Sequence, residues 1–432
     1  MVKFCDDELS IVLVTYKRPA FVREWLDNCL LELHERNISL EVYDSSDDNK
    51  TKEVVDYFSN LYGIPVKYTY ISDKLSVGHV VWEAIKQAQT DYVWVVGDSR
   101  RHSFEELDEK VFPYIKQQYE HIVLETIDNG ENDGRIYISR HEMIYNCLIS
   151  MTCTGYYIYR RSIFNRIISD PNLFEECKLK YDDNYGFTWM GYFLESYSLN
   201  NEYKTVFTRV RTYTIAPEKK IIRWNEVFFK CWVDDLCNIV DNCDSSYCVS
   251  DDLLKKVWNY LAFDMSFRLY ENRKAGVLNK EVYDKYAVLI KRVSNHAEKI
   301  RDYAYSKEDD LEKCHNYWRE AEEREFVSNI NKTIDIIGRT KGERSICVYG
   351  AGYGCKILLK TLANFDVNVK TIYDRDGEKI QNLDGVPVKT LNCCNPDSEI
   401  IIISFYKSYV PILPDLLQYG YAREDVYYVK YL

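Results

Sequence analysis

The first hundred residues of the chain alternate between short apolar runs and longer segments in which apolar positions recur with helical spacing. Short apolar runs are typical of strands buried on both faces of a parallel sheet, and apolar positions at i and i+4 are typical of helices that cover such a sheet. The predicted strands are 10–14, 40–43, 66–71 and 92–96, and the predicted helices are 20–36, 51–61 and 80–89. This order of elements predicts an α/β fold with right-handed crossovers.

A cluster of polar residues follows each of these predicted strands. The clusters are Thr15–Arg18, Asp44–Asp48, Ser72–Lys74 and Asp98–His102. The carboxyl ends of parallel strands lie along one edge of a sheet, which is where open α/β sheets bind ligands. Carboxylates can accept hydrogen bonds from a base or a ribose, and Lys and Arg can bind phosphates, so the pattern indicates a nucleotide site. Acids at loop starts also cap helices and turns, and for Asp47 and Asp48 both roles stay open.

The pattern changes from strands to helices further along the chain. It predicts a helix over 105–118, strands over 121–127 and 152–161, and a helix over 163–169. From about residue 224 to residue 339, aromatic-rich apolar stripes recur with helical spacing. Such stripes are normally the packed interior of a helical bundle, although a lid beside an acceptor or an oligomer interface stays open.

The C-terminal segment predicts a further, smaller α/β unit. Its first strand, SICVYG, is followed by Gly350, Gly352 and Gly354 and then by a helical pattern. Asp374 ends the next predicted strand, at the distance along the chain at which the acid of a dinucleotide-binding unit reaches a ribose. Cys355 stands where that pattern has its third glycine, so the match is imperfect. We therefore expect a small Rossmann-like domain that serves as a binding or scaffolding module.

These patterns give an expected organisation in three parts. A nucleotide-binding α/β domain occupies 1–220, a helical domain occupies 221–340, and a Rossmann-like α/β domain occupies 341–432. The net charge of −12 argues against nucleic acid as a partner, because proteins that bind a phosphate backbone present a basic face.

The 14 cysteines include no C-x-x-C pair, which argues against zinc ribbons and thioredoxin-like proteins and favours a reducing, cytoplasmic setting. The N-terminus lacks a signal-peptide pattern, and no apolar run reaches about 18 residues, the length of a membrane span. We therefore expect a cytoplasmic protein, and association with the inner face of the membrane stays open.

Three stretches in the first half of the chain carry a resemblance to a known family. They are SIVLVTYKRP, LEVYDSSDDNKT and LSVGHVVWEAIKQAQTDYVWVVGDSR. They resemble, in order, the opening strand and nucleotide-contacting turn, the second strand with the acid that reads the base, and the segment before the Asp-x-Asp metal motif of family 2 glycosyltransferases with a GT-A fold. The resemblance covers about residues 8–215 and implies a GT-A domain that binds a nucleotide-diphosphate sugar, with a UDP-sugar favoured.

The resemblance also implies which residues bind the donor. Thr15 and Asp44 would contact the base, and Asp98 would contact the ribose or a metal ion. The other residues expected at the donor site are Tyr16, Arg18, Lys74, Gly78 and Arg100.

The stretch around Asp98 departs from the family, which usually has two or three acids at this place. A divalent ion, Mn²⁺ or Mg²⁺, needs oxygen ligands and would neutralise the leaving diphosphate. Three arrangements stay open. Asp98 could hold the metal together with the diphosphate and water, His102 could help as a ligand, or Arg100 or Arg101 could replace the metal as the cation.

The resemblance implies a transferase that inverts the anomeric carbon, and such an enzyme needs a general base near the acceptor hydroxyl. In the family this base is an acid downstream of the strand expected here over 152–161. The candidates are Asp183, Asp182 and Glu195. Asp182 and Asp183 could equally cap the next segment. Glu195 lies in an apolar helical pattern that would either bury it and raise its pKa or leave it on an ordinary polar face.

We therefore expect a glycosyltransferase of polysaccharide biosynthesis that moves a sugar to a glycan, lipid-linked or protein acceptor. Two alternatives stay open. The reduced acid motif would also fit a GT-A domain that binds nucleotide sugars, or acts as a scaffold, without catalysis. The other alternative is a nicotinamide-dependent enzyme centred on Gly350 to Gly354. A homo-oligomer is compatible with either function.

Overall fold

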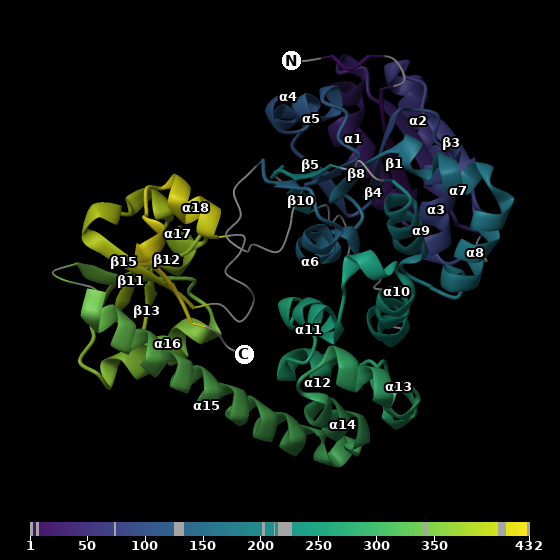
Figure 1. Ribbon diagram of the computed structural model, residues 1–432. Helices are drawn as coiled ribbons and strands as arrows, with labels where there is room; N and C mark the ends of the chain where they lie inside the picture. The colour runs from purple at the N-terminus through teal and green to yellow at the C-terminus, as the bar shows by residue number, and fades with distance from the viewer. Residues whose placement is uncertain are drawn as a thin grey trace. The chain divides into compact units, whose positions relative to one another are not determined.

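The computed structural model describes residues 3–5, 8–72, 75–124, 134–200, 204–210, 212–214, 227–340, 342, 344–404 and 412–429 (Figure 1). The chain forms two compact units. Unit 1 comprises Met1–Val257 with Lys285–Asn295, and unit 2 comprises Trp258–Asp284 with His296–Leu432.

An eight-stranded mixed sheet forms the centre of unit 1, with the strand order β3-β2-β1-β4-β8-β6-β9-β7. Its strands are β1 (Leu9–Thr15), β2 (Ser39–Asp44), β3 (Lys67–Tyr70), β4 (Tyr92–Gly97), β6 (His121–Val123), β7 (Ile136–Tyr137), β8 (Tyr157–Arg160) and β9 (Thr205–Phe207). The first four strands are parallel, whereas β8 runs antiparallel to both β4 and β6. The predicted α/β fold class, with a GT-A-like first sheet, is confirmed.

Helices cover the sheet because apolar side chains of each strand point alternately to its two faces. On one face, Ile11 and Leu13 of β1 pack in one cluster with Trp25 of α1 and Phe58 of α2. Helix α3, whose buried residues lie outside that cluster, contacts β1 and β4. The three helices are α1 (Pro19–Glu35), α2 (Lys50–Tyr62) and α3 (Val77–Gln87), within about three residues of their predicted bounds.

Two predicted elements of unit 1 are wrong in part. The helix expected over 105–118 is divided at Val111, and Pro113 lies in the first turn of the last piece, where its missing N–H is tolerated. The strand expected over 152–161 is limited to β8, because the chain turns at Gly155, where φ is +103°. The pieces of the divided helix are η1 (Phe104–Glu106), α4 (Leu107–Lys110) and α5 (Phe112–Lys116).

The rest of the GT-A-like part contains elements that the sequence pattern predicts poorly. Of the strand expected over 121–127, β6 ends at Val123, and residues 125–127 lie outside the described residues. Helices α6 and α8 are not predicted at all. The elements are α6 (Arg140–Met151), η2 (Arg161–Phe164), α7 (Asn165–Ser169), α8 (Pro171–Tyr181), α9 (Thr188–Ser198) and a two-stranded sheet of β5 (Arg100–His102) with β10 (Thr212–Thr214).

The stretch expected to be helical over 224–339 is mostly helical in its described part. Its elements are the π-helix η4 (Lys230–Asp235), α10 (Leu236–Asn242), η5 (Ser245–Tyr247), α11 (Asp251–Tyr260), α12 (Ser266–Lys274), α13 (Lys280–Val293), α14 (Ala297–Tyr305) and α15 (Glu308–Thr340). These helices are shared between the two units, and the three-part division stays a proposal. Within the described residues, no helix is both long enough and apolar enough to cross a membrane.

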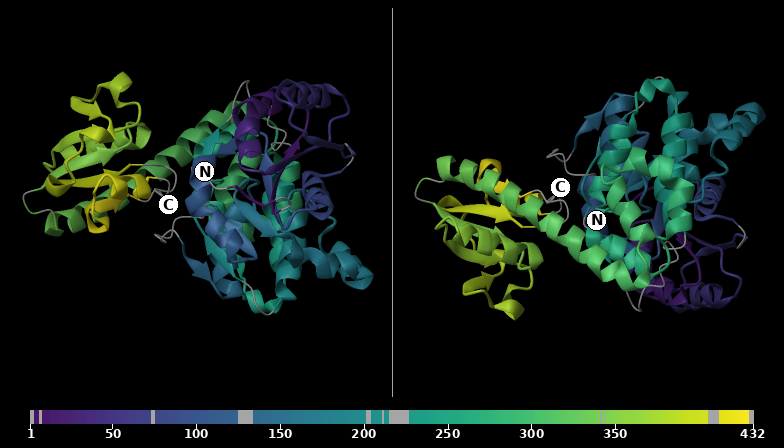
Figure 2. Two further views of the ribbon diagram at one scale, coloured as in Figure 1. Left: turned by 90° about the horizontal axis from the view of Figure 1, so that it is seen from above. Right: turned by 90° about the horizontal axis from the view of Figure 1, so that it is seen from below.

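A six-stranded sheet of order β13-β14-β12-β11-β15-β16 forms the C-terminal part of unit 2. On one face, Ile330 of α15 and Leu358 of α16 pack on Val348 of β11, and the C-terminal part of α15 lies along this face (Figure 2). On the other face, Leu416 of α18 packs with Tyr373 of β12. The elements are β11 (Ser345–Tyr349), α16 (Tyr353–Ala363), β12 (Val369–Tyr373), α17 (Gly377–Ile380), β13 (Asn382–Leu383), β14 (Val386–Lys389), η6 (Leu391–Cys393), η7 (Pro396–Ser398), β15 (Glu399–Ile403), α18 (Leu413–Gln418), η8 (Arg423–Asp425) and β16 (Val426–Tyr428).

Candidate active site

The strand register brings three of the predicted site residues together at the carboxyl edge of the first sheet. Thr15, the last residue of β1, is paired with Asp44, the last residue of β2. On the other side of β1, Val14 is paired with Gly97 of β4, so Asp98 follows directly beside Thr15. Because these strands are parallel, the three side chains lie at the edge where such sheets bind ligands.

Asp98 is nearly buried at this edge, with 4% of its surface exposed. The hydroxyl of Thr15 donates a hydrogen bond of 2.7 Å to its Oδ2, and Nη1 of Arg18 lies 3.1 Å from its Oδ1. The guanidinium offsets the charge of a carboxylate that has little access to water. Asp98 therefore fixes the turn after β1 against the end of β4.

Asp44 is fully buried. Its Oδ1 accepts hydrogen bonds from the backbone N–H of Ser46 (2.9 Å) and from the Ser46 hydroxyl (2.5 Å), and its Oδ2 accepts one from the hydroxyl of Tyr68 (2.9 Å). Burial and the Asp44 carboxylate raise the pKa of Tyr68, so the phenol keeps the proton that it donates. Both carboxylate oxygens of Asp44 therefore have partners within the protein. The contact of Asp44 with the base of a nucleotide, which the resemblance implies, stays a prediction.

Arg100 lies on β5, whose backbone pairs with β10. Its guanidinium carbon stands 4.9 Å from the ring centroid of Tyr156, and Nη1 donates to the Tyr156 hydroxyl. The indole N–H of Trp25 donates to the carbonyl oxygen of Arg100 at 3.0 Å. Arg100 is thus a partly buried cation, held by both its backbone and its side chain, two residues after Asp98.

His102 is buried below this edge, with 2% of its surface exposed. Its ring packs 4.8 Å from the ring of Trp94 and lies close to Gly155, and its Nε2 has no hydrogen-bond partner among the described residues. Burial, helped by the charge of Arg100, lowers the pKa of His102 to about 3. The imidazole is therefore neutral at physiological pH.

The residues present do not by themselves fit a divalent metal ion. Such an ion needs several oxygen or nitrogen ligands close together. No group of three or more His, Cys, Asp or Glu side chains that could hold one occurs in the described part of the chain. Both oxygens of Asp98 already have partners, and the ring of His102 faces Trp94 and Gly155. The assignment of Asp98 and His102 as metal ligands therefore stays a prediction.

The other predicted donor residues lie around the same turns. Tyr16 is half-buried, and the ammonium of Lys17 stands 5.4 Å from the centroid of its ring. Lys74 lies outside the described residues. Gly78 is buried in the first turn of α3, where an added Cβ would come within 2.7 Å of Oγ1 of Thr188 in α9. Its backbone N–H donates to the carbonyl oxygen of Tyr185 at 3.0 Å.

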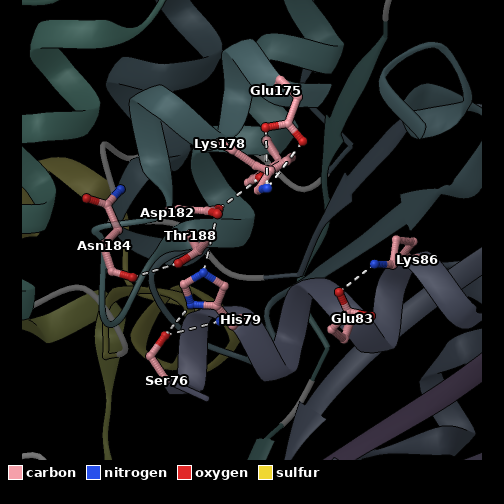
Figure 3. A network of polar contacts seen from close by, with 10 residues as sticks. Ser76, His79, Glu83, Lys86, Glu175, Lys178, Asp182, Asn184 and Thr188 are labelled. Atoms are coloured by element: carbon pink, nitrogen blue, oxygen red, sulfur yellow. Dashed lines mark hydrogen bonds and ion pairs between the residues drawn. The ribbon is translucent and has the colours of Figure 1, made fainter. Parts of the chain in front are cut away.

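Asp182, one of the predicted bases, contacts this same turn of α3 (Figure 3). It follows the last residue of α8, and Nε2 of His79 lies 3.6 Å from its Oδ1. The hydroxyl of Tyr192 in α9 donates to the same oxygen at 3.0 Å. Because α3 begins after the carboxyl end of β3, its first turn lies at the edge that carries Asp98. Asp182 is thereby brought to the edge of the sheet that carries Asp98.

The two other predicted bases have different surroundings. Asp183 is exposed, and it makes no hydrogen bond or ion pair with the described residues. Glu195 lies on α9 and is 13% exposed at its side chain. Its Oε1 lies 2.7 Å from Nζ of Lys180 and accepts a hydrogen bond of 3.0 Å from the hydroxyl of Tyr181. Glu195 is therefore part of an ion pair between α8 and α9.

The segment between α8 and α9 is held in place by a buried acid from farther along the chain. Oδ2 of Asp235, the last residue of the π-helix η4, accepts a hydrogen bond of 2.6 Å from the backbone N–H of Gly186. Nζ of Lys230 lies 3.1 Å from its Oδ1. Burial raises the pKa of Asp235 to about 6 despite these partners.

The glycine-rich loop of unit 2 is closed by its own acid. Gly350 has φ of +97°, and Gly352 stands at the N-terminus of α16 with nothing near the place of a Cβ. Asp374 accepts a hydrogen bond from Ala351 N–H (2.8 Å) through Oδ2 and one from Asp376 N–H (2.9 Å) through Oδ1. Asp374 thus stabilises the loop, and its contact with a ribose stays a prediction. The other residues expected there are Gly354 and Cys355, both of which are buried.

Sequence reasoning did not select His79, Tyr68, Tyr192 or Asp235. The signal for His79 is its place three residues after Ser76, the N-cap of a helix that follows a predicted ligand-binding edge. No local signal marks the other three, because their partners are 10 to 49 residues away along the chain.

Comparison with known proteins gives one family match. Residues 10–189, fewer than half of the 432 residues, match the model of the family described as Glycosyl transferase family 2. No curated protein sequence matches the chain significantly.

Two of the similar solved structures illustrate how low the sequence identity is. S. aureus TarS 1–349 in complex with UDP-GlcNAc is 13% identical, with a TM-score of 0.42 over 73% of this chain and 92% of that chain. Mannosyltransferase PcManGT from Pyrobaculum calidifontis, in complex with GDP-Man and Mn²⁺, is 11% identical, with a TM-score of 0.39 over 70% of this chain and 87% of that chain. Likeness at these TM-scores assigns neither fold nor activity. The family match shows only that residues 10–189 are similar to the Glycosyl transferase family 2 model.

Proposed function

We propose that the chain is a glycosyltransferase that moves a sugar from a nucleotide-diphosphate sugar to the hydroxyl of a glycan, lipid-linked or protein acceptor. The observation that carries the proposal is the coincidence of the family match over 10–189 with the edge at which Thr15, Asp44 and Asp98 end neighbouring strands. A UDP-sugar is the favoured donor, and polysaccharide biosynthesis is the expected setting.

In this proposal the nucleotide lies across the ends of β1, β2 and β4. Thr15, Tyr16 and Asp44 are closest to the base, and Asp98 is closest to the ribose. Arg18 and Arg100 are the cations that face the diphosphate, because Arg18 pairs with Asp98, Arg100 follows Asp98 by two residues, and both are only partly buried. Positive charge fixed beside the leaving diphosphate stabilises the charge that develops as the bond to the sugar breaks. Lys74 and Gly78 complete the proposed donor set.

The proposed reaction is a single displacement with inversion. The acceptor oxygen bonds to the anomeric carbon, the bond from that carbon to the diphosphate breaks, and the acceptor proton passes to a carboxylate. We propose Asp182 as this base, since Glu195 is engaged with Lys180, and Asp183 is exposed with no partner among the described residues that would orient it. A divalent ion, if bound, would supply further charge neutralisation to the diphosphate.

A ligand screen tests the donor class. The purified full chain is melted with UDP-, GDP-, CDP- and dTDP-sugars, and with NAD and NADP, each with and without Mn²⁺. A ligand at 100 times its dissociation constant stabilises the folded state by roughly 2.7 kcal/mol, which is easily detected. We expect a shift with one class of nucleotide sugar, together with release of its nucleoside diphosphate. A shift with NAD or NADP alone would contradict the proposal.

Two matched variants test whether turnover depends on the edge of the sheet that carries Asp98. Asp98→Ala removes the acid that fixes Arg18, and we expect it to lower turnover at least about 100-fold. Asp56→Ala removes an exposed acid of α2 whose one ion pair with a described residue is with Lys52, and it should behave as the wild type. Wild-type turnover of Asp98→Ala would contradict the assigned site.

One specific observation favours a second candidate, a domain that binds nucleotide sugars without transferring them. The stretch 98–102 contains one acid, Asp98, and that acid already has two protein partners. Binding of a nucleotide sugar with no release of nucleoside diphosphate, tested with mono- and oligosaccharide acceptors, would favour this candidate.

A further inference from the structure

His79 has a structural surrounding that an ordinary surface histidine lacks. It lies in the first turn of α3, and its ring is drawn between Ser76 and Asp182 in Figure 3. Its Nδ1 is 2.7 Å from the hydroxyl oxygen of Ser76, and its Nε2 is 3.6 Å from Oδ1 of Asp182. The three side chains therefore form a line from an N-cap serine through an imidazole to a carboxylate.

The Ser76 hydroxyl can donate a hydrogen bond to the ring of His79. Its oxygen accepts a hydrogen bond of 3.3 Å from the backbone N–H of His79 as the N-cap of α3. The hydroxyl hydrogen is then available to Nδ1, which accepts it in the neutral imidazole. In the tautomer that accepts from this hydroxyl, the ring proton is on Nε2, the nitrogen that faces Asp182.

The two donors around Asp182 converge on one of its oxygens. The hydroxyl of Tyr192 donates to Oδ1 at 3.0 Å, and Nε2 of His79 faces the same atom. Burial and the Asp182 carboxylate raise the pKa of Tyr192, so its phenol remains a donor. Oδ2 of Asp182 accepts no hydrogen bond from any described residue. This leaves one carboxylate oxygen anchored and the other available.

Helix packing holds this arrangement rigidly. The rings of Trp82 and Tyr192 stack with centroids 4.3 Å apart, which fixes α9 against α3 one turn beyond His79. Gly78 permits the close approach of α3 to Thr188 at the start of α9, and Gly78 N–H bonds to the carbonyl of Tyr185. His79 and Tyr192, the two groups that face Oδ1 of Asp182, are thus held by two helices in direct contact.

We infer that His79 is a positioning residue for Asp182: it holds Oδ1, with Tyr192, so that Oδ2 takes the proton from the acceptor hydroxyl. The distance of 3.6 Å is longer than a hydrogen bond in the ligand-free chain, and such contacts often tighten when substrates bind. The inference rests on the proposed transferase function and adds a residue to it. Asp182 remains the group that receives the proton.

The test compares three substitutions of His79 in the full chain, with nucleoside diphosphate release from the active donor as the readout. His79→Leu removes the donor and should lower kcat about 10- to 100-fold, with the KM for the donor within about twofold of wild type. His79→Gln places an amide N–H near the position of Nε2 and should recover much of this loss. Glu83→Gln, on the same helix, removes an acid that pairs with Lys86 and should not change kcat.

A double-mutant cycle separates a positioning role from a structural one. If His79 acts through Asp182, then His79→Leu should change the residual rate of the Asp182→Asn variant by less than about twofold. Equal losses in both backgrounds, or a fall in melting temperature of His79→Leu that His79→Gln does not repair, would indicate a structural role and overturn the inference. Wild-type kcat in His79→Leu would also overturn it. If the wild-type chain consumed none of the four nucleotide sugars, the proposed function would fail, and this inference with it.

Discussion

The carboxylate of Asp235 accepts a hydrogen bond of 2.6 Å from the backbone N–H of Gly186, across 49 residues of sequence. The acid belongs to a π-helix, and the glycine belongs to the segment that joins Asp182 to α9. A Cβ at residue 186 would come within 2.8 Å of the sulfur of Cys231, so the π-helix and this segment are in close contact. The helical part of unit 1 therefore supports the segment that carries the proposed base.

Stability should depend on pH through Asp235. Burial raises its folded-state pKa from 3.8 to about 6, so between these values the folded state binds a proton that the unfolded state lacks. The resulting stabilisation is complete below pH 3.8 and is lost as the pH rises through 6, and it amounts to roughly 3 kcal/mol. Asp235→Asn keeps an oxygen for Gly186 and cannot ionise. Melting curves from pH 4.5 to 7.5 should show wild type losing stability relative to this variant, whereas parallel curves would disprove the assignment.

Thr15→Val should lower the free energy of unfolding of unit 1, because it removes a hydrogen bond at the edge of the sheet that carries Asp98. The substitution keeps the side-chain shape but removes the hydroxyl that donates to Oδ2 of Asp98. A buried carboxylate oxygen without its donor costs about 1–3 kcal/mol. Thr15→Ser keeps the hydroxyl and is the matched control. Urea unfolding measures both variants, and equal stabilities would mean that the hydrogen bond contributes nothing.

Gly78→Ala should destabilise unit 1. The added methyl group would lie 2.7 Å from Oγ1 and 2.8 Å from the backbone nitrogen of Thr188, so α3 and α9 would have to separate. Overpacking of this kind costs about 1–3 kcal/mol. Gly338→Ala in α15 meets nothing within 4 Å and should instead stabilise the helix by up to about 1 kcal/mol. Opposite shifts in melting temperature are expected for the two variants.

Asp374→Ala should open the glycine-rich loop of unit 2. Two backbone N–H groups, of Ala351 and Asp376, would lose their acceptor, at a cost of about 1–3 kcal/mol. Asp376→Ala removes only an exposed ion pair with Lys379 and should have a small effect. The measurement is denaturant unfolding followed by circular dichroism. If NAD or NADP stabilises the wild type but not Asp374→Ala, the nicotinamide hypothesis regains support.

The proximity of Thr15, Asp44 and Asp98 could be predicted because it depends only on strand order. Apolar runs separated by amphipathic helices fix a parallel arrangement, and parallel strands end at the same edge. The observed register places Thr15 opposite Asp44, as that argument requires. Local sequence therefore carried enough information for the layout of the edge.

The contacts of those residues could not be predicted in the same way. Tyr68 looks like an ordinary strand tyrosine, yet it donates to Asp44 through the pairing of β2 with β3. The aromatic stretch before Arg160 has the composition of a strand, but the hydrogen bond from Gly155 N–H to the carbonyl of Val95 (2.7 Å) holds its first part as a turn. Tertiary contacts of this kind override local propensity.

The close approach of α3 to α9 has a consequence for the design of chimeric proteins. Gly78 has no side chain, and Thr188 fills the space that one would occupy. A chimera that imports the segment from 182 to 188 from another protein of this fold would therefore bring a new residue against position 78. Helix α3 and this segment should be transplanted together, because they are fitted to each other at a single missing carbon atom.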